Sequence, residues 1–245
     1  MNIGVYGLGR FGSFWAALLA EKGHNVMGFS KHRKPEIPGV TLCDENTVLS
    51  QDNIFFCVSI SSFGEVIKNT IDRIKPNSLV MDTCSVKLYP VEIMERYNRE
   101  DISYLPLHPM FGPDSGKEGI EGLPLVVCPL DCPSLYVRRW KKEFKKWGLD
   151  VISMSPDIHD KQSAYSQGIT HFVGRTLDEL GLEDTKLATK GYKSLLTIRE
   201  QTCNDPLQLF YDLQRYNPYA KDMRLNLRRA LMETLLVLES QEEAR

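Results

Sequence analysis

The chain lacks the features that mark membrane-spanning, secreted and strongly charged proteins. No apolar run approaches the roughly 20 residues that a spanning helix requires, and no signal-peptide pattern precedes the first strand-like run. The formal net charge of -2 gives no bulk attraction to nucleic acid or to an anionic membrane. We therefore expect a cytoplasmic protein that binds a small molecule and has neither nucleic acid nor a membrane as partner.

The cysteines do not follow the spacing patterns of a disulfide-bonded or zinc-binding protein. The six cysteines are scattered, mostly in apolar contexts, as is typical of reduced, buried thiols in an intracellular domain. Cys128 and Cys132 are close enough to raise the alternative of structural zinc, but no second Cys or His pair follows at ligand spacing. Pro129 and Pro133 favour a turn there, and we predict no metal. Neither an internal repeat nor a low-complexity segment is present.

The first part of the chain alternates strand-like and helix-like patterns. The composition, 42% hydrophobic and 25% charged, is ordinary for a globular protein with a proper core. Between the first two strand-like runs, Phe11, Trp15 and Leu18 recur at helical spacing and form one apolar face. This order predicts an α/β domain with a Rossmann-type doubly wound sheet. The predicted strands are Asn2–Tyr6, Asn25–Phe29, Val40–Cys43, Asn53–Val58, Ser78–Asp82, Ser103–Leu107, Pro124–Val127 and Asp150–Ser153.

Strand signals stop near Ser155, and long helical patterns follow. We therefore predict two domains, a dinucleotide-binding domain over residues 1–154 and a small all-α domain over residues 155–245. Apolar positions on more than one helix face predict that the second domain contacts another subunit, so we expect a homodimer. The predicted helices are Ile158–Leu180, Thr185–Cys203, Pro206–Tyr216 and Pro218–Glu239.

A basic run with interleaved aromatic residues, 138–147, resembles a nucleic-acid-binding stripe at first sight. Trp140, Phe144 and Trp147 follow one another at helical spacing, so they share one face and the lysines occupy the opposite face. This periodicity favours a plain amphipathic helix.

The segment Gly7-Leu8-Gly9-Arg10-Phe11-Gly12 follows the first strand-like run and opens the first helix-like one. In this context Gly7 permits a tight turn, Gly9 lets backbone N–H groups approach a pyrophosphate, and Gly12 allows close packing of helix on strand. Arg10 and Phe11 fall within the same turn. The segment predicts a dinucleotide site, with a ligand-free strand-helix turn as the alternative.

The second predicted strand ends in a basic turn, where an NAD-binding unit usually carries an acidic residue. Ser30, Lys31 and Arg33 offer a hydroxyl and two cations that can bind a 2'-phosphate. A charge-assisted hydrogen bond is worth about 1.5 to 3 kcal/mol, which corresponds to roughly a ten- to hundredfold preference for NADP. The alternative is a merely solvated basic turn. Ser59, just past the fourth predicted strand, is placed to line the same crevice.

The strip His108-Pro109-Met110-Phe111-Gly112-Pro113 holds one titratable ring in a backbone constrained by two prolines and a glycine. A histidine held in this way can exchange protons near neutral pH. Beside a dinucleotide site, it predicts a proton acceptor next to a nicotinamide.

Several motifs in one order resemble the TyrA family of prephenate and arogenate dehydrogenases, and most of all its plant-type arogenate dehydrogenases. The resemblance extends from the glycine loop to about Leu238. It is carried by His108–Gly116 (HPMFGPDSG), Asp82–Lys87 (DTCSVK), Ser166–His171 (SQGITH), Thr189–Tyr192 (TKGY) and Tyr216–Pro218 (YNP). It implies oxidative decarboxylation of a cyclohexadienol in tyrosine biosynthesis, with hydride transfer to the dinucleotide.

The resemblance also implies roles for individual residues. By similarity, His108 is the base that takes the hydroxyl proton, and Ser85 hydrogen-bonds the same hydroxyl. His171 matches a substrate-binding histidine, with Gln167 and Thr170 nearby on the same helix. Asp160 matches an acidic position that accompanies preference for arogenate, whose ammonium replaces the keto group of prephenate. Arg199 lies near the position of an arginine that clamps a substrate carboxylate.

Structural alternatives remain open for four of these residues. They are a core or capping histidine for His108, a loop hydroxyl for Ser85, a surface histidine for His171 and a helix N-terminal acid favoured by the helix dipole for Asp160. At the level of function, the alternatives are another oxidoreductase of the β-hydroxyacid dehydrogenase or pyrroline-carboxylate reductase type, or a dinucleotide sensor without chemistry. Those two enzyme types resemble the glycine loop but do not share the strip that begins at His108.

Overall fold

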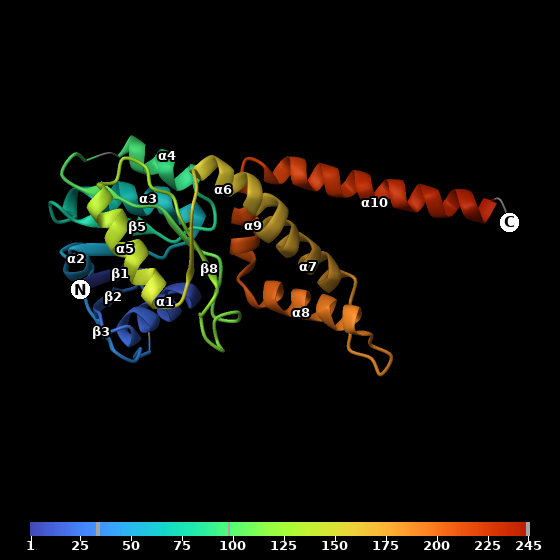
Figure 1. Ribbon diagram of the computed structural model, residues 1–245, viewed down its shortest axis with the longest axis horizontal. Helices are drawn as coiled ribbons and strands as arrows, with labels where there is room; N and C mark the ends of the chain where they lie inside the picture. Colours follow the sequence, from blue (N-terminus) through green and yellow to red (C-terminus); the bar gives the residue numbers. More distant parts are fainter. Residues whose placement is uncertain (33–34, 98, 244–245) are drawn as a thin grey trace. The chain divides into compact units, whose positions relative to one another are not determined.

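The computed structural model describes residues 1–32, 35–97 and 99–243 (Figure 1). The chain divides into two compact units, Met1–His159 and Asp160–Arg245. The division falls five residues after the predicted boundary, because the first turn of a helix that follows Ser155 belongs to unit 1. His159 on that turn hydrogen-bonds to His108.

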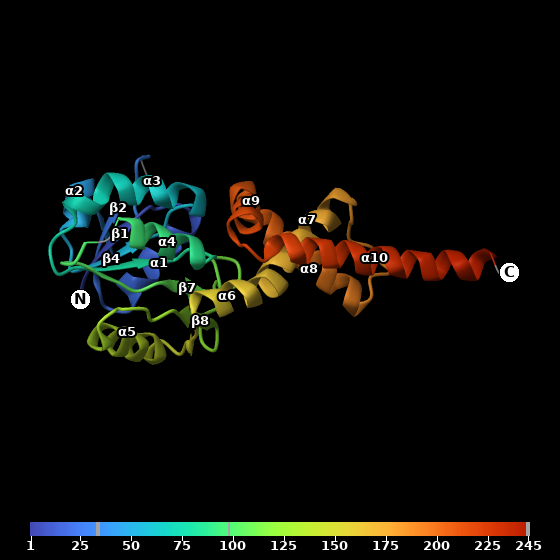
Figure 2. The ribbon, with the colours of Figure 1, turned by 90° about the horizontal axis from the view of Figure 1, so that it is seen from above.

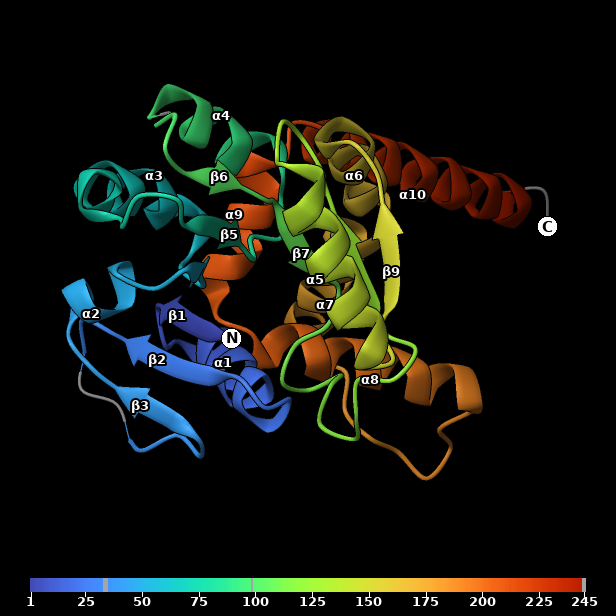
Figure 3. The ribbon, with the colours of Figure 1, turned by 60° about the vertical axis from the view of Figure 1, so that its left-hand side comes forward.

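Unit 1 contains the predicted doubly wound sheet (Figure 3). Its six strands pair in parallel in the order β3-β2-β1-β4-β5-β6. The chain order reverses between β1 and β4, and the carboxyl ends of these two strands border the crevice where such sheets bind ligands. The strands are β1 (Asn2–Tyr6), β2 (Asn25–Phe29), β3 (Val40–Leu42), β4 (Asn53–Phe56), β5 (Leu79–Asp82) and β6 (Ser103–Tyr104).

Helices cover both faces of this sheet, with α2 and α3 on one side and α5 on the other (Figure 2). The helices of unit 1 are α1 (Arg10–Glu21), α2 (Glu45–Leu49), α3 (Ile60–Thr70), the 3-10 turn η1 (Ile71–Arg73), α4 (Leu88–Arg96) and α5 (Ser134–Lys146). Trp15 on α1 packs edge-on against Phe55 of β4 at 5.7 Å between ring centroids. This aromatic core fixes the start of α1 against the carboxyl ends of the strands.

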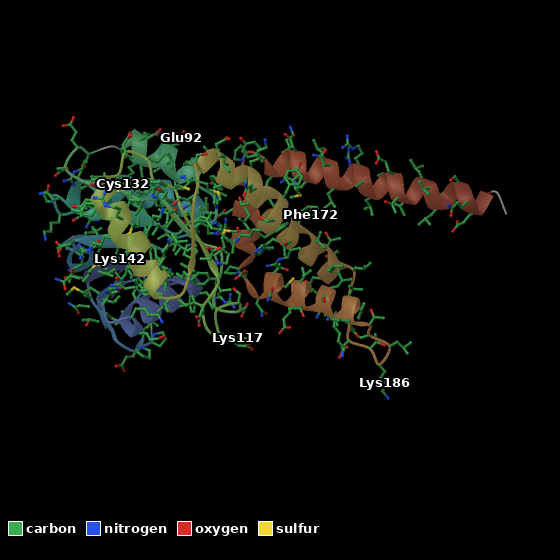
Figure 4. The ribbon with its side chains drawn as sticks, viewed as in Figure 1. Glu92, Lys117, Cys132, Lys142, Phe172 and Lys186 are labelled. Atoms are coloured by element: carbon green, nitrogen blue, oxygen red, sulfur yellow. The ribbon has the colours of Figure 1, made fainter. Side chains whose placement is uncertain are left out.

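The prediction for helix 138–147 is confirmed. Trp140 and Phe144 are fully buried in the core, and Trp140 Nε1 donates to Asn53 Oδ1 at 3.2 Å. Lys142, labelled in Figure 4, lies on the solvent-exposed side of the same helix. The basic residues therefore form the outer face of a packed amphipathic helix.

The prediction of one strand over Ser103–Leu107 is wrong. Within this segment, β6 ends at Tyr104 and a new strand, β7 (Leu107–Pro109), begins. β7 belongs to a separate three-stranded sheet with β8 (Pro124–Val127) and β9 (Asp150–Ser153). Pro106 lies at the break, and because proline has no N–H it cannot continue the ladder. β7 then pairs antiparallel with β8, which sets His108 opposite Val126.

Unit 2 is helical, as predicted, but the boundaries differ. The predicted helix Ile158–Leu180 is a continuous run of α6 (Pro156–Ser163), a π-helical turn η2 (Ala164–Gly168) and α7 (Ile169–Glu179). It is followed by α8 (Lys190–Asn204), α9 (Leu207–Tyr216) and α10 (Ala220–Glu243). α8 begins five residues later than predicted, because Thr189 caps it by accepting the N–H of Tyr192 at 3.2 Å.

Two features of unit 2 bear on its function. α7 and α8 approach closely at Gly174, where an added Cβ would lie 2.0 Å from Thr202 Oγ1. α10 exposes a row of large apolar side chains: Leu225, Leu231, Met232, Leu235, Leu236, Val237 and Leu238. Within the described part of the chain, no helix has both the length and the apolar character needed to cross a membrane.

Candidate active site

The glycine loop has the geometry that a dinucleotide pyrophosphate requires. Gly7 adopts a φ of +99°, and an added Cβ there would lie 2.6 Å from the carbonyl oxygen of Cys57. A Cβ on Gly12 would lie 1.8 Å from the carbonyl oxygen of Gly7, so α1 packs directly on the loop. Gly9, the N-cap of α1, faces open space, with no atom within 4 Å of an added Cβ. The loop thus combines close internal packing with one open approach at a helix N-terminus, which fits an anionic ligand.

The end of β2 lies beside this loop, because the N–H of Gly7 donates to the carbonyl oxygen of Phe29 at 2.9 Å. Ser30 follows directly and accepts the N–H of His32, and the side chain of Lys31 is exposed. Arg33 lies outside the described residues. Ser59 is the exposed N-cap of α3 at the carboxyl end of β4. Ser30 and Lys31 of the predicted phosphate site and Ser59 of the predicted crevice therefore all follow the carboxyl ends of strands in the same sheet.

Arg10 connects the glycine loop to the strip that contains His108. Its guanidinium forms a half-buried ion pair with Asp114 at 2.7 Å. Phe11 packs on Trp15 with 5.9 Å between ring centroids. The structure thus places Arg10 between the two predicted motifs and gives Phe11 a packing role at the rim of the aromatic core.

His108 is 1% exposed, and its Nδ1 lies 2.8 Å from Nε2 of His159. Burial, then the neighbouring His159 and then Lys87, hold the pKa of His108 well below its usual value. The imidazole of His108 is therefore neutral at physiological pH, as a base must be. Because Nδ1 is engaged by His159, Nε2 is the nitrogen left to act on a substrate.

Ser85 lies half-buried on the loop between β5 and α4. The carboxylate of Asp82 holds this loop on both sides of Ser85: its Oδ1 accepts the N–H of Cys84 at 2.8 Å and also accepts from Lys87 Nζ. Tyr104 donates to Oδ2 of the same carboxylate at 2.6 Å. Lys87 Nζ also donates to the carbonyl oxygen of Leu107 at 2.5 Å, one residue before His108. The loop of Ser85 and the strand of His108 are thus joined through one lysine.

In unit 2, three buried polar atoms line up along one helical face, four residues apart. Gln167 Oε1, His171 Nδ1 and Arg175 Nε have no hydrogen-bond partner among the described residues. Burial, and then the charge of Arg175, lower the pKa of His171 to about 4, so this ring is also neutral at neutral pH. An unsatisfied buried polar group costs about 1 to 3 kcal/mol, so these three atoms call for a polar partner, such as an ordered water or a ligand.

The remaining predicted residues of unit 2 lie apart from this row or are engaged by the fold. Thr170 is exposed and donates to the carbonyl oxygen of Ser166 on its own helix at 2.8 Å. Asp160 is completely buried. Arg199 donates to the carbonyl oxygen of Leu182, past the far end of α7, whereas His171 lies in the first turn of α7. The arginine beside His171 is Arg175.

Family models match both units of this chain. Residues 18–135 match the prephenate dehydrogenase nucleotide-binding domain, and residues 176–245 match the TYRAAT1-like C-terminal domain. Over 232 residues, 90% of the chain, the sequence is 34% identical to arogenate dehydrogenase 2, chloroplastic, of Arabidopsis thaliana. The nucleotide-binding domain thus matches that of prephenate dehydrogenases, and the chain as a whole is similar to arogenate dehydrogenases. The resemblance seen in the motifs is thereby confirmed.

Two further comparisons set the extent of this family likeness. Arogenate dehydrogenase 1, chloroplastic, of Arabidopsis thaliana is 34% identical over 91% of the chain. The chain covers 65% and 37% of the lengths of the two Arabidopsis enzymes, less than two thirds of either. The fold matches that of prephenate dehydrogenase from A. aeolicus, solved with hydroxyphenyl propionate and NAD+, with a TM-score of 0.76 at 20% identity over 99% of this chain and 93% of that chain. This likeness confirms the predicted fold, a Rossmann-type sheet followed by a helical domain.

Sequence reasoning missed several residues of the site: Asp82, Lys87, Tyr104, His159 and Arg175. Asp82 and Lys87 bound the DTCSVK motif, and the presence of two opposite charges next to an apolar strand was a signal for them. His159 and Arg175 had no comparable signal, because each gains its meaning from a neighbour that the fold supplies. Within the described ranges, no group of three His, Cys, Asp or Glu side chains is placed to hold a metal. The absence of zinc at Cys128 and Cys132 stays a prediction.

Proposed function

We propose that this protein oxidatively decarboxylates arogenate, prephenate or both, with hydride transfer to NADP, as a step of tyrosine biosynthesis. The observation that carries the proposal is a buried, neutral His108, oriented by His159, in the same unit as a glycine loop open at Gly9. A dinucleotide sensor without chemistry requires no neutral base in that unit. The other Rossmann oxidoreductases weighed above do not share the strip that begins at His108.

The proton step follows from the histidine pair. If His108 Nδ1–H donates to His159 Nε2, the lone pair of His108 is on Nε2, where it can accept the proton of the substrate hydroxyl. The resulting imidazolium keeps its hydrogen bond to His159, which fixes the ring as a carboxylate does in a catalytic triad. Ser85 holds the same hydroxyl by a hydrogen bond. Loss of carbon dioxide then yields an aromatic ring and drives the reaction.

The cofactor we propose is a nicotinamide dinucleotide, which accepts the hydride. The N-terminus of α1 at Gly9 binds its pyrophosphate, and Arg10 stands beside that position. Ser59 lines the crevice at the start of α3. Ser30 and Lys31, together with Arg33, bind the 2'-phosphate and so favour NADP.

NADP should bind about ten- to hundredfold more tightly than NAD, because the turn after β2 offers cations and a hydroxyl to the extra phosphate. Lys31→Glu should reduce or reverse this ratio, since a carboxylate repels the phosphate and accepts ribose hydroxyls. Titration calorimetry with both dinucleotides measures the ratio. Lys142→Glu, which makes the same charge reversal at an exposed position on α5, is the matched control and should leave the affinity ratio unchanged. Equal affinities in the unmodified protein would contradict the NADP assignment.

For substrate binding we propose the row Gln167, His171 and Arg175. A cyclohexadienol of this type carries carboxylates, and a guanidinium is the group that pairs best with a carboxylate. Arg175 Nη2 is anchored by the carbonyl oxygens of Thr202 and Asp205, at 3.0 and 2.7 Å, and its buried Nε lacks a partner within the described residues. Thr170 and Arg199 are assigned to the substrate by resemblance alone, because Thr170 is exposed and Arg199 is engaged beyond the far end of α7.

Arg175→Met should raise the KM for the dienol substrate by about 10- to 100-fold, the effect of losing a charge-assisted hydrogen bond. The KM for the dinucleotide should stay the same. Arg199→Met is the matched control, because its guanidinium is engaged at the other end of α7. Steady-state kinetics, with thermal unfolding to verify both variants, make the measurement. If Arg199→Met raised the substrate KM more than Arg175→Met does, Arg199 and not Arg175 would be the residue that binds the substrate carboxylate.

Asp160 is the residue we assign to a preference for arogenate, through pairing with the substrate ammonium. The ratio of the specificity constants for arogenate and prephenate, in the unmodified protein and in Asp160→Asn, tests this assignment. An unchanged ratio would remove it.

We propose that the protein is a homodimer through its helical unit. The exposed apolar row on α10 supports this, since a 24-residue helix with such a surface gains stability from a second copy. Light scattering on unmodified protein and on Leu231→Lys distinguishes dimer from monomer. The cytoplasmic location stays a prediction, and the Arabidopsis relatives are named chloroplastic.

The proposed reaction is tested by incubating the protein with NADP and each dienol. Reduced cofactor is followed by absorbance, and the aromatic product is identified by mass spectrometry. Formation of reduced cofactor and an aromatic amino acid or keto acid in equal amounts supports the proposal. Binding of NADP without turnover on either dienol would favour the sensor, and turnover only on a hydroxy acid or an imine would favour the other oxidoreductases.

A further inference from the structure

The most unusual polar group in unit 1 is Lys87, because its side chain is 0% exposed. Lysine is almost never fully buried unless it is paired. Lys87 Nζ donates to the equally buried carboxylate of Asp82 and, at 2.5 Å, to the carbonyl oxygen of Leu107. An ion pair in such a place is weak evidence for stability, because desolvation offsets the attraction between the charges. A role in positioning accounts better for its location.

The two acceptors of Lys87 belong to two different catalytic segments. Asp82 ends β5 and closes the loop that carries Ser85, since it also accepts the N–H of Cys84. Leu107 immediately precedes His108 and lies 20 residues away from Lys87 in the chain. β5, which ends at Asp82, and β7, which begins at Leu107, belong to separate sheets, so no strand ladder joins the two segments among the described residues. One ammonium group therefore fixes the distance between the serine and the histidine.

Three titratable groups lie near the ion pair of Lys87 and Asp82. Tyr104, from β6, donates to Asp82 Oδ2 at 2.6 Å, and Cys84 lies on the loop itself. Burial, then the carboxylate of Asp82, raise the pKa of both Tyr104 and Cys84 well above the usual values, so both stay neutral. His159, from α6, faces His108 from the other side. The two charged partners in the hydrogen bonds of this link are Lys87 and Asp82.

We propose that Lys87 is a positioning residue that holds the Ser85 loop in register with His108, because its one ammonium group donates both to Asp82 and to the carbonyl oxygen of Leu107. The proposal rests on the proposed function for its meaning in catalysis. The registration follows from the two hydrogen bonds of Nζ. Its positive charge has a second effect, because a cation near an imidazole disfavours a second positive charge.

The test replaces both buried charges at once, with the double variant Asp82→Asn/Lys87→Met. Replacing a buried pair by neutral groups of similar volume is often close to neutral for folding, whereas removing one partner leaves an unpaired buried charge. Histidine NMR titration, with the His108 signals assigned by comparison with His108→Gln, gives the pKa of His108 without any substrate. We expect that pKa to rise relative to the unmodified protein, because the Lys87 cation is one of the causes that lower it.

Kinetics give the second readout. In the double variant, kcat should fall by about 10- to 100-fold, as expected when reacting groups lose alignment. The acidic limb of kcat/KM should move to higher pH together with the NMR value, since a base that protonates more easily is lost at higher pH. The KM for the dinucleotide should not change. A lysine with a merely structural role moves neither the NMR titration nor the acidic limb.

Two further variants keep the test decisive. Lys75→Met, which removes an exposed lysine paired with Asp52 at 2.6 Å, is the matched control and should leave both readouts unchanged. Lys87→Arg retains the charge but changes its reach, so it should lower kcat while leaving the pKa of His108 near the wild-type value. If the double variant does not fold, the kcat of Lys87→Arg still tests the positioning role. A wild-type kcat in Lys87→Arg, or an unshifted His108 in a folded double variant, overturns the proposal. If the unmodified protein turns over neither dienol, the proposed function fails, while the NMR titration still decides the charge effect.

Discussion

His108→Ala lowers the turnover of the dienol substrate by about two to four orders of magnitude, the usual effect of removing a general base. The imidazole is buried, neutral and oriented through Nδ1 by His159, so no other described group is placed to replace it at the same atom. The affinity for the dinucleotide should stay within about threefold, because the glycine loop does not depend on the ring. Stopped-flow measurement of the hydride step, beside calorimetric binding of the dinucleotide, separates the two quantities.

His24→Ala provides the control for this result. His24 is also a histidine of unit 1, but its ring packs against Trp140 and Trp147, and its polar neighbours are the N-terminus and Glu143. Its removal should affect thermal stability and leave turnover near normal. A His108 variant with near-normal turnover would exclude the ring from the mechanism and leave His159 as the residue to test next.

Gly9→Ala weakens dinucleotide binding by about 10- to 100-fold and leaves the fold intact. An added Cβ meets nothing within 4 Å in the protein, so the methyl group projects only into the space at the N-terminus of α1 that the pyrophosphate requires. Calorimetric titration with NADP, together with the midpoint of thermal unfolding, measures both effects. Unchanged affinity would contradict the placement of the pyrophosphate at this loop.

Alanine substitutions at two other glycines are the controls for Gly9→Ala. Gly12→Ala should destabilise the protein itself by at least about 1 to 3 kcal/mol, because the new Cβ would lie 1.8 Å from the carbonyl oxygen of Gly7 and the loop must move. Gly191→Ala, in α8, meets its nearest atom at 4.0 Å and should be neutral or slightly stabilising for unfolding, with normal dinucleotide binding. The three variants separate loss of ligand space from loss of packing.

The parts of the fold that sequence patterns predicted are those governed by local physics. The glycine loop depends on positions five residues apart, and the structure gives Gly7 and Gly12 the geometry expected of them. The periodicity of α5 correctly placed Trp140 and Phe144 in the core and the lysines in solvent. The strand over Ser103–Leu107 failed because a continuous apolar run does not reveal that Pro106 divides it between two sheets.

The sequence by itself determined the class of fold and singled out the glycine loop as the candidate dinucleotide site and His108 as the candidate base, since each of these rests on residues that are neighbours in the chain. Only the tertiary structure decided how His108 is tuned, because His159 lies 51 residues away from it in the chain and Leu107 lies 20 residues away from Lys87. Hydrogen bonds and charge effects act over a few ångströms in space, whatever the separation in sequence. The residues that orient and tune a base therefore become visible only when the chain has folded around it.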